Sequence, residues 1–347
     1  MRAFTCHRCA QRLFFENSVC LRCGAEVGFA PSRGELVVRA DSPGLRPCAN
    51  ARIAGCNWLV DAGARAARED DPGEGALCAS CRLTRTRPGD GDSAGLAAFA
   101  VAEAAKRRLL FQLRDLNLPI ESDLGFDLLS SAHGPVSTGH ADGLITIDLA
   151  ESDDARREAR RQQLAEPYRT LLGHFRHEIG HYYEPILVDR GGHSEAARAR
   201  FGDERADYGA ALEAHYAAGP PADWAQRHVS AYATMHPYED WAETFAHYLH
   251  IRDTLQTAAA FELHVGGPTP SLRADPTDAL APDLPFSALL ADWLPLTYAL
   301  NQVNRSMGHD DLYPFTLAPA VIDKLTFVHA CVTGAGAASG PPGPLAA

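Results

Sequence analysis

The 347-residue sequence has almost no lysine and no long apolar run. Arginine supplies all but two of its basic residues, and we attach no functional role to that bias. No apolar run approaches the ~18–20 residues that cross a bilayer, so we expect no membrane span and no membrane partner. The first residues lack an apolar stretch followed by a small-residue cleavage site, which predicts a cytoplasmic location without a secretory signal.

Positive charge is scarce outside the N-terminal quarter of the chain. The net charge is −12, but residues 1–90 hold 13 arginines against 10 acidic residues, while the remainder holds 19 basic and 34 acidic residues. An acidic body repels phosphate, so nucleic acid is an unexpected partner. The composition, 46% hydrophobic and 22% charged, is typical of a globular protein.

Cysteine is abundant, and it is concentrated at one end. Eight of the nine cysteines precede residue 82. In a reducing compartment such a cluster binds metal more often than it forms disulfides. The first four form two C-x2-C pairs, a spacing that can close a tetrahedral four-thiolate zinc site: Cys6, Cys9, Cys20 and Cys23. We therefore predict a zinc ribbon over residues 1–30, with the metal supplying its folding energy.

A second, looser set of four cysteines follows in residues 31–90. The spacing is C-x7-C and then C-x2-C: Cys48, Cys56, Cys78 and Cys81. We interpret this set as a second zinc module, with Trp58, Leu59 and Val60 as a miniature core. The alternative is one redox or structural pair plus two unrelated cysteines. Either module is a candidate surface for a protein partner.

The rest of the chain, residues 91–332, is predicted to form one mainly helical domain with a small sheet, which gives an α+β fold. Apolar residues at helical spacing predict a helix from about 96 to 116, and helical segments recur from Pro167 to about 260. Pro167 suits the first turn of the helix that follows it. Further helices are expected near 286–305 and 318–331.

Three other segments have patterns of their own. Runs rich in apolar residues at 123–131 and 143–150 predict two strands. The charged segment 151–166 has an acidic start and predicts an exposed helix. The low-complexity tail, residues 333–347, is predicted to be disordered.

The stretch LLGHFRHEIGHYYEP, residues 171–185, contains the motif HExxH. Positions four apart share one face of a helix, so His177 and His181 can direct two nitrogens at one metal. Glu178 lies beside them and can act as general base on a metal-bound water. We expect His174 to be a hydrogen-bonded neighbour. Gly180 costs about 1 kcal/mol relative to alanine inside a helix, which indicates close approach of another backbone or of substrate.

A catalytic zinc needs a third protein ligand, which residues 230–251 can supply. Glu239 and Glu243 stand one turn apart beside an apolar stripe, and two carboxylates there are costly unless they are charge-paired or metal-bound. One ligand glutamate and a second acid that orients a ligand histidine would explain both. Either glutamate could be the ligand.

Other residues near the motifs suit a ligand role less well. Asp240 points about 100° away from its neighbour Glu239 around a helix. His247 and His250 are expected to be partly exposed helix histidines. The acid-rich segment 201–208 lacks the ligand spacing of a calcium loop and is expected to be a salt-bridged loop or helix start. Cys331 is expected to be buried and inert.

HExxH followed by ExxxE on a later helix resembles the gluzincin metallopeptidases, and YATMHPYEDWAE is similar to the anthrax lethal factor type of catalytic domain. That resemblance implies that Glu239 binds zinc, Glu243 supports a ligand histidine and Tyr232 stabilises the oxyanion. For Tyr232 a simple core position is the alternative. The chain to about residue 330, including the segments EPYRTLLGHFRHEIGHYY and HPYEDWAETFAHYLHI, resembles the bacterial zinc-ribbon and zinc-binding metallopeptidase family. Glu184 departs from the tryptophan expected there in that family.

Two functions compete for this sequence. The resemblance implies a zinc metallopeptidase that hydrolyses peptide bonds in a protein or peptide substrate, with one catalytic and two structural zinc ions. The strand expected at 143–149 would be the edge that pairs with the extended substrate. The alternative is a non-catalytic, zinc-stabilised module that binds protein or nucleic acid. The intact HExxH and ExxxE favour the enzyme, because a pseudo-enzyme usually lacks its general base or a ligand.

Overall fold

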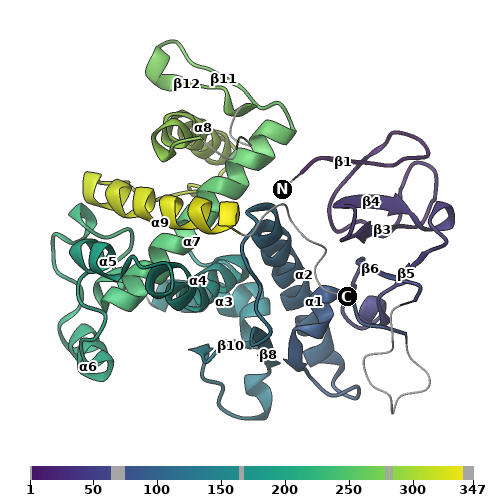
Figure 1. Ribbon diagram of the computed structural model, residues 1–347, viewed down its shortest axis with the longest axis horizontal. Coiled ribbons are helices and arrows are strands. Elements are labelled where there is room, and N and C mark those ends of the chain that lie inside the picture. Colours follow the sequence, from purple (N-terminus) through teal and green to yellow (C-terminus); the bar gives the residue numbers. More distant parts are fainter. Residues whose placement is uncertain (1, 64–74, 164–167, 278–280, 282–283, 339–347) are drawn as a thin grey trace. The chain divides into compact units, whose positions relative to one another are not determined.

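The structure is a computed structural model that describes residues 2–63, 75–163, 168–277, 281 and 284–338 (Figure 1). It divides into two compact units. Of the described residues, the first unit holds the chain up to Asp115 together with Ile120–Ala159, and the second holds Leu116–Pro119 together with those from Arg160 to Ala338. The predicted α+β architecture with two four-cysteine clusters is confirmed. Pro167 lies outside the described residues.

The first unit combines short paired strands with a long helix and a small sheet. Its strands are β1 (Phe4–Thr5), β2 (Arg12–Leu13), β3 (Val27–Ala30), β4 (Glu35–Val38), β5 (Leu45–Pro47), β6 (Leu59–Asp61), β7 (Thr84–Thr86), β8 (Gly125–Leu129), β9 (Gly139–Ala141) and β10 (Leu144–Asp148). Its helices are α1 (Ala79–Arg82), α2 (Ser93–Asp115) and the start of α3 (Asp154–Gln163).

An aromatic core joins the two cysteine modules to α2. It consists of Phe4, Phe15, Phe29, Trp58 and Phe111, with neighbouring ring centroids 4.9–6.4 Å apart. The predicted core around Trp58 is real, but it is shared between the modules. Phe111 belongs to α2, so this helix falls in the same compact unit as the cysteines. The boundary expected after residue 30 falls inside the β3–β4 hairpin.

The four-stranded sheet has the order β7-β8-β10-β9, with β9 antiparallel to β10 and the other neighbours parallel. Strands β8 and β10 correspond to the two predicted strands. The expectation that residues 143–149 form an open edge is wrong, because β10 is paired on both sides. The turn at Asp142 and Gly143, both with positive φ, folds β9 back onto it.

The second unit is mainly helical. Its longer elements are α4 (Leu171–Glu184), the π-helix η5 (Pro185–Asp189), α5 (Ser194–Phe201), α6 (Tyr208–Ala218), α7 (Pro237–Ala260), α8 (Phe286–Ser306) and α9 (Pro319–Ala338). It also contains the strand pair β11 (Val265–Gly266) and β12 (Arg273–Ala274). Residues 333–338, which we expect from the sequence to be disordered, instead continue α9, whereas residues 339–347 lie outside the described chain. Among the described helices, none combines the length and apolar character that a membrane crossing requires.

Helix α4 packs along α7, and Gly180 lies at their closest approach. A Cβ atom on Gly180 would lie 2.9 Å from Cα of Ala242, so only glycine fits without displacing the α7 backbone. The indole nitrogen of Trp241 donates to the carbonyl oxygen of Gly180 at 2.9 Å. The rings of Tyr183 and Phe245 stack with centroids 5.6 Å apart. The close approach of another backbone expected from Gly180 is therefore confirmed.

Both lysines of the chain are buried in ion pairs. Lys106 on α2 lies 2.6 Å from a carboxylate oxygen of Glu103, and both side chains are fully buried. Lys324 on α9 lies 2.5 Å from Oδ2 of Asp240 on α7, and its side chain is 5% exposed. Each pair thus joins charges that would be costly to bury alone.

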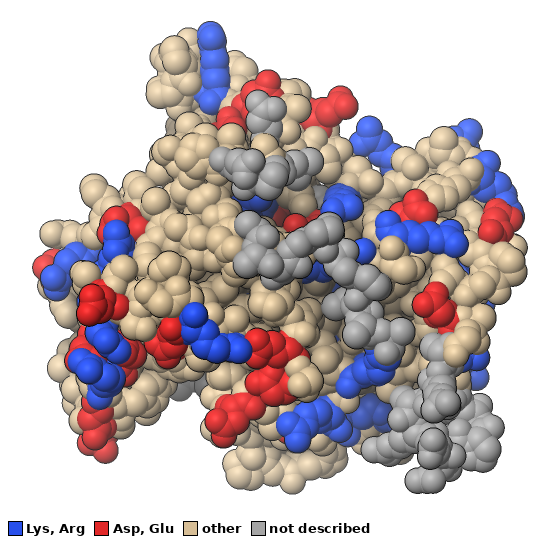
Figure 2. Space-filling view, in the orientation of Figure 1, with Lys and Arg blue, Asp and Glu red and all other residues tan. Residues whose placement is uncertain are grey.

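Charges of both signs are mixed over α5 and the segment that leads to α6, at the left of Figures 1 and 2. The ion pairs are Arg198–Glu204 at 2.5 Å, Arg205–Asp203 at 2.7 Å and Arg200–Asp323 at 3.0 Å. The acid-rich segment 201–208 is therefore a salt-bridged loop that leads into a helix, as predicted. Asp207 caps that helix, because its Oδ1 accepts from the amide of Ala210 at 2.8 Å.

Candidate metal centre

The helix that carries HExxH begins at a side-chain cap. Oγ1 of Thr170 accepts a hydrogen bond from the amide of Gly173 at 3.0 Å. From that start, α4 places His177 and His181 one turn apart on a single buried face. The facing helix α7 begins at Pro237 with His236 as its cap, and Glu239 lies in its first turn. The N-terminal end of a helix favours a carboxylate, which suits Glu239 in this place.

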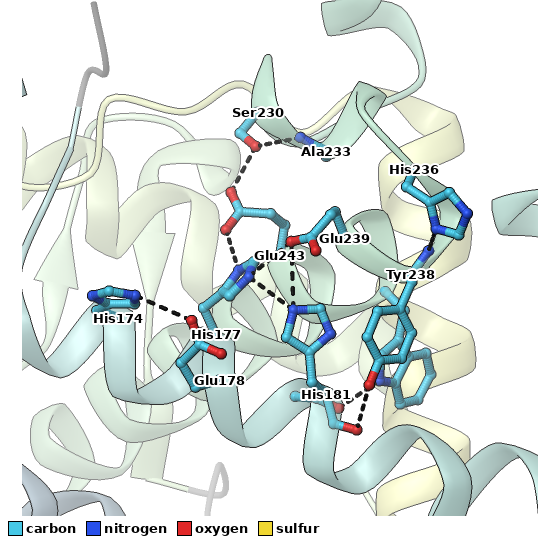
Figure 3. A network of polar contacts seen from close by, with 12 residues as sticks. His174, His177, Glu178, His181, Ser230, Ala233, His236, Tyr238, Glu239 and Glu243 are labelled. Atoms are coloured by element: carbon cyan, nitrogen blue, oxygen red, sulfur yellow. Dashed lines mark hydrogen bonds and ion pairs between the residues drawn. The ribbon is translucent and has the colours of Figure 1, made fainter. Parts of the chain in front are cut away.

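Three side chains converge at this point (Figure 3). Nε2 of His177 lies 3.1 Å from Nε2 of His181 and 3.0 Å from Oε2 of Glu239, and Nε2 of His181 lies 3.4 Å from that same oxygen. Ligand bonds of about 2.0–2.1 Å in a tetrahedral zinc site place ligand atoms about 3.3–3.4 Å apart. These three residues could therefore hold a metal ion.

The chemistry of Glu239 fits a metal as well as its geometry does. The residue is 3% exposed, and the described residues that approach its buried Oε2 are the two histidines, whose Nε2 atoms lie 3.0 and 3.4 Å away and would themselves bind a metal. A buried carboxylate is costly unless a cation compensates its charge. Burial by itself would raise the pKa of Glu239. The neighbouring rings of His177 and His181 together outweigh burial, so the pKa of Glu239 lies well below its usual range.

Glu243 lies on the other side of His177. Its Oε1 is 2.7 Å from Nδ1 of His177, and its Oε2 accepts from Oγ of Ser230 at 2.6 Å. Ser230 in turn accepts from the amide of Ala233 at 3.1 Å. Burial raises the pKa of Glu243, yet the bond and charge of His177 bring it down to about 2. A carboxylate on the far nitrogen of a ligand histidine is the usual outer partner of such a ligand.

The second oxygen of Glu239 has a partner that the sequence did not suggest. The hydroxyl of Tyr208 donates to Oε1 of Glu239 at 2.9 Å. Tyr208 is the first residue of α6, and its ring also lies 5.3 Å from that of His236, centroid to centroid. Burial, followed by the charge of Glu239, raises its pKa, so it remains a donor. No spacing in the sequence links Tyr208 to Glu239, so the motifs alone do not identify this contact.

The glutamate of HExxH is held by the histidine one turn before it. Nε2 of His174 lies 3.1 Å from Oε1 of Glu178, which confirms His174 as a hydrogen-bonded neighbour. Oε2 of Glu178 is buried and has no hydrogen-bond partner among the described residues. Burial raises the pKa of Glu178, but His174 and the nearby rings of His177 and His181 leave it below its usual value.

The remaining candidates from the sequence take up structural positions. The ring of Tyr232 lies 6.0 Å from that of His177, centroid to centroid, so it borders the centre. Asp240 faces Lys324 instead of the metal ligands. The expectation that His247 is partly exposed is wrong, because it is 5% exposed and its Nδ1 lies 2.7 Å from the hydroxyl of Tyr313. The sequence gives the same expectation for His250, which is half-buried. Nδ1 of His250 lies 2.7 Å from Nη1 of Arg176.

The eight N-terminal cysteines form two separate clusters, and in each the four sulfur atoms lie within 4.8 Å of one another: Cys6, Cys9, Cys20 and Cys23, and Cys48, Cys56, Cys78 and Cys81. Within these clusters, Sγ–Sγ distances are 3.8 Å for Cys6–Cys23, 3.6 Å for Cys9–Cys20 and 3.6 Å for Cys56–Cys78. Zn–S bonds of about 2.3 Å place the sulfurs of a tetrahedral site about 3.8 Å apart. Both sets thus could hold a metal. The ninth cysteine, Cys331, is buried, which raises its pKa to about 12.

Comparison with known proteins agrees with this geometry. Residues 3–92 match a zinc-ribbon domain family, and residues 95–331 match the family described as "Putative zinc-binding metallo-peptidase". The chain belongs to this metallopeptidase family. Its relatives in the family include uncharacterized proteins of Mycobacterium tuberculosis (strain H37Rv) and Mycobacterium bovis, each 51% identical over 340 residues, which cover 96% of this chain and 95% of the relative. No solved structure matches the chain significantly. Family membership supports zinc binding and a peptide substrate, and it confirms the family resemblance seen in the sequence.

Proposed function

We propose that this protein is a gluzincin-type zinc metallopeptidase with one catalytic and two structural zinc ions. The observation that carries the proposal is the convergence of His177, His181 and Glu239 next to Glu178 on one helix pair. This arrangement supplies three protein ligands and a carboxylate that is not one of them. It is the set that a hydrolytic zinc site requires, since a fourth coordination position is left for water or substrate.

A zinc ion held by these three ligands would lower the pKa of a water molecule towards ~7 and polarise a peptide carbonyl. Glu243 is then the residue that fixes the tautomer of His177, because it accepts at Nδ1 and leaves Nε2 free to bind. Tyr208 occupies Oε1 of Glu239 and so directs Oε2 alone to the metal. Ser230 completes the chain by holding Glu243.

Glu178 acts as general base in this proposal. Its lowered pKa keeps it ionised at neutral pH, and its buried Oε2 is available for the proton of the attacking water. His174 fixes the other oxygen, so the carboxylate is oriented before substrate binds. After attack, Glu178 passes the proton to the leaving amine. One carboxylate therefore serves both proton transfers.

Tyr232 is the proposed donor to the oxyanion. Burial, followed by the charge of Glu239, raises the pKa of Tyr232, so its hydroxyl stays protonated at neutral pH. A protonated phenol next to the centre can donate to the carbonyl oxygen as negative charge develops there. Tyr208 cannot substitute while its hydroxyl is engaged with Glu239.

The test is a comparison of the wild type with Glu178→Gln on a peptide library, with cleavage read by mass spectrometry. Loss of a general base costs about 10²–10⁴-fold in rate, and we expect zinc content to stay unchanged. Glu213→Gln on the exposed surface of α6 removes the same charge and should cleave like the wild type. Full activity of Glu178→Gln with full zinc content would refute the general-base role. Failure of the zinc-loaded wild type to cleave any member of the library would refute the peptidase.

A further inference from the structure

The two four-cysteine clusters of the first unit differ in how deeply they are buried. In the first cluster Cys9 is partly exposed and Cys23 is exposed, so water can screen the charge of its thiolates. The second cluster is buried throughout, with each cysteine at most 4% exposed: Cys48, Cys56, Cys78 and Cys81. Four thiolates on a divalent ion carry a net charge of −2, which is costly inside a protein unless charged partners compensate it. The second site therefore needs cations from the protein itself.

Helix α2 brings a buried ionic cluster against this site. Oε2 of Glu103 lies 3.8 Å from Sγ of Cys81. Nζ of Lys106, nearly one turn further along α2, lies 2.6 Å from Oε1 of Glu103 and also donates to Oγ1 of Thr84. Nη1 of Arg107 lies 3.7 Å from Oε2 of Glu103. The three charged side chains of α2 are each at most 4% exposed, so water does not screen their charges.

Arg107 also reaches the chain at a second ligand of the same cluster. Its Nη2 donates to the carbonyl oxygens of Ala54 at 3.2 Å and of Gly55 at 3.5 Å, and these residues immediately precede Cys56. Its Nη1 is buried and has no hydrogen-bond partner among the described residues. Helix α2 thus lies beside the cluster at both Cys56 and Cys81, which come from different segments of the chain.

The charges on this part of α2 do not balance by themselves. Lys106 and Arg107 share a single carboxylate, that of Glu103, as their ion-pair partner among the described residues, which leaves one positive charge in excess. A buried cation without compensation is strongly destabilising. Four neutral thiols or two disulfides would leave this excess in place, whereas four thiolates on zinc supply negative charge next to it.

We propose that Lys106 and Arg107 are the cations that compensate the charge of the second zinc site. Glu103 holds both cations beside the thiolates, but it adds a negative charge of its own. The inference rests on the zinc that the proposed function assigns to this cluster, and it does not depend on peptidase activity. It assigns the retention of that zinc to residues outside the zinc-ribbon match, in the region that matches the metallopeptidase family.

The experiment measures the zinc affinity of each cluster separately in the full-length protein. Zinc-loaded protein is equilibrated with increasing concentrations of a chelator and treated with N-ethylmaleimide, and the alkylated cysteines are identified by mass spectrometry. Bound zinc protects a cluster from alkylation, so the chelator concentration at half protection reports its affinity. In Lys106→Met this midpoint should fall about 10–100-fold at the second cluster, the usual effect of losing an outer partner of a metal ligand. The first cluster should keep its wild-type midpoint.

Glu103→Gln separates charge compensation from a purely structural role of α2. Glutamine has nearly the same shape, and its carbonyl oxygen can still accept a hydrogen bond from Lys106, but it carries no charge. Because both cations then remain without the opposing carboxylate, the second cluster should hold zinc at least as tightly as in the wild type. If α2 contributed only an intact hydrogen-bonded network, Glu103→Gln would weaken zinc binding as Lys106→Met does. Weaker binding in Glu103→Gln would therefore overturn the inference.

Lys324→Met is the matched control, because it removes the other buried, ion-paired lysine from the second unit. It should leave both cysteine clusters at their wild-type midpoints. An unchanged second cluster in Lys106→Met would overturn the inference, and Arg107→Met provides the same test if Lys106→Met fails to fold. Alkylation of the second cluster in the purified wild type without chelator would refute its zinc site. The assay does not read cleavage, so either failure leaves the proposed peptidase activity intact.

Discussion

Nδ1 of His177 lies 2.7 Å from Oε1 of Glu243, so the carboxylate faces the nitrogen that does not point to the metal position. Glu243→Gln should weaken zinc binding by about 10–100-fold, the usual cost of losing an outer partner of a metal ligand. Ser230→Ala removes the hydrogen bond behind Glu243 and should weaken binding in the same direction, but less. Competition with a chromogenic chelator measures both affinities. Loss of zinc as complete as in His177→Ala would instead make Glu243 a ligand.

The number of zinc ions per chain tests the three sites together. We expect about three in the wild type and about two in the double variant His177→Ala, His181→Ala, because each four-cysteine cluster closes a separate site. Cys48→Ser, Cys56→Ser should remove a different zinc and leave the histidine site occupied. Elemental analysis of the purified proteins gives the counts. About two zinc ions in both the wild type and the histidine variant would mean that the HExxH helix binds none.

A substitution at Gly180 tests how closely α4 packs against α7. In Gly180→Ala the new Cβ would approach Cα of Ala242 to 2.9 Å, so α4 and α7 would have to separate. We expect the free energy of unfolding to fall by about 1–3 kcal/mol, with weaker zinc binding. Gly334→Ala on α9 is the matched control, because a Cβ there meets nothing within 4 Å. It should stabilise the protein by up to about 1 kcal/mol through helix propensity alone. Urea unfolding compares the two, and equal stability would disprove the tight approach.

Because an aromatic core joins α2 to the cysteine modules, removal of the Phe111 ring should strongly lower the stability of the first unit. Phe111 is 1% exposed and packs 4.9 Å from Phe15, centroid to centroid. Phe111→Ala should destabilise the first unit by about 3–5 kcal/mol and make its zinc easier to extract. Phe14 is 73% exposed, so Phe14→Ala should change stability by less than about 0.5 kcal/mol. Similar unfolding curves for the two variants would argue that α2 is not part of that core.

Substitution of the two tyrosines at the centre should have different effects, one on turnover and the other on zinc affinity. Tyr232→Phe removes the proposed oxyanion donor and should lower kcat by about 10²–10³-fold with zinc affinity unchanged. Tyr208→Phe removes the hydrogen bond to Glu239, so its first effect should be on zinc affinity. Steady-state kinetics and chelator competition on both variants make the comparison. A fully active Tyr232→Phe would reduce Tyr232 to a core residue.

The sequence was most informative where helical periodicity relates residues close in the chain. HExxH and ExxxE each place two side chains one turn apart, and the structure brings both pairs together around His177. The contact between Tyr208 and Glu239 could not be predicted, because it depends on how the loop after α5 returns to α7.

Errors in the prediction have equally physical causes. Strand β10 looked like an edge because β9 is only three residues long and has no apolar alternation, although its turn residues allow the tight return. The predicted boundary at residue 91 is a different case, because it lies beside the change of family match between residues 92 and 95, and Phe111 shows only that α2 also packs on the aromatic core of the cysteine modules. Composition marks where a linker begins, and it does not show which core a following helix completes.

The two buried lysines have a consequence for any chemistry directed at amines. Acylation or isopeptide conjugation of a lysine requires an accessible ε-amino group, and Lys106 and Lys324 are both buried in ion pairs in the folded chain. Lys106 belongs to the first unit and Lys324 to the second. An amine-reactive label should therefore modify Lys106 only when the first unit opens and Lys324 only when the second unit opens. The unfolding of each unit can thus be followed at its own lysine.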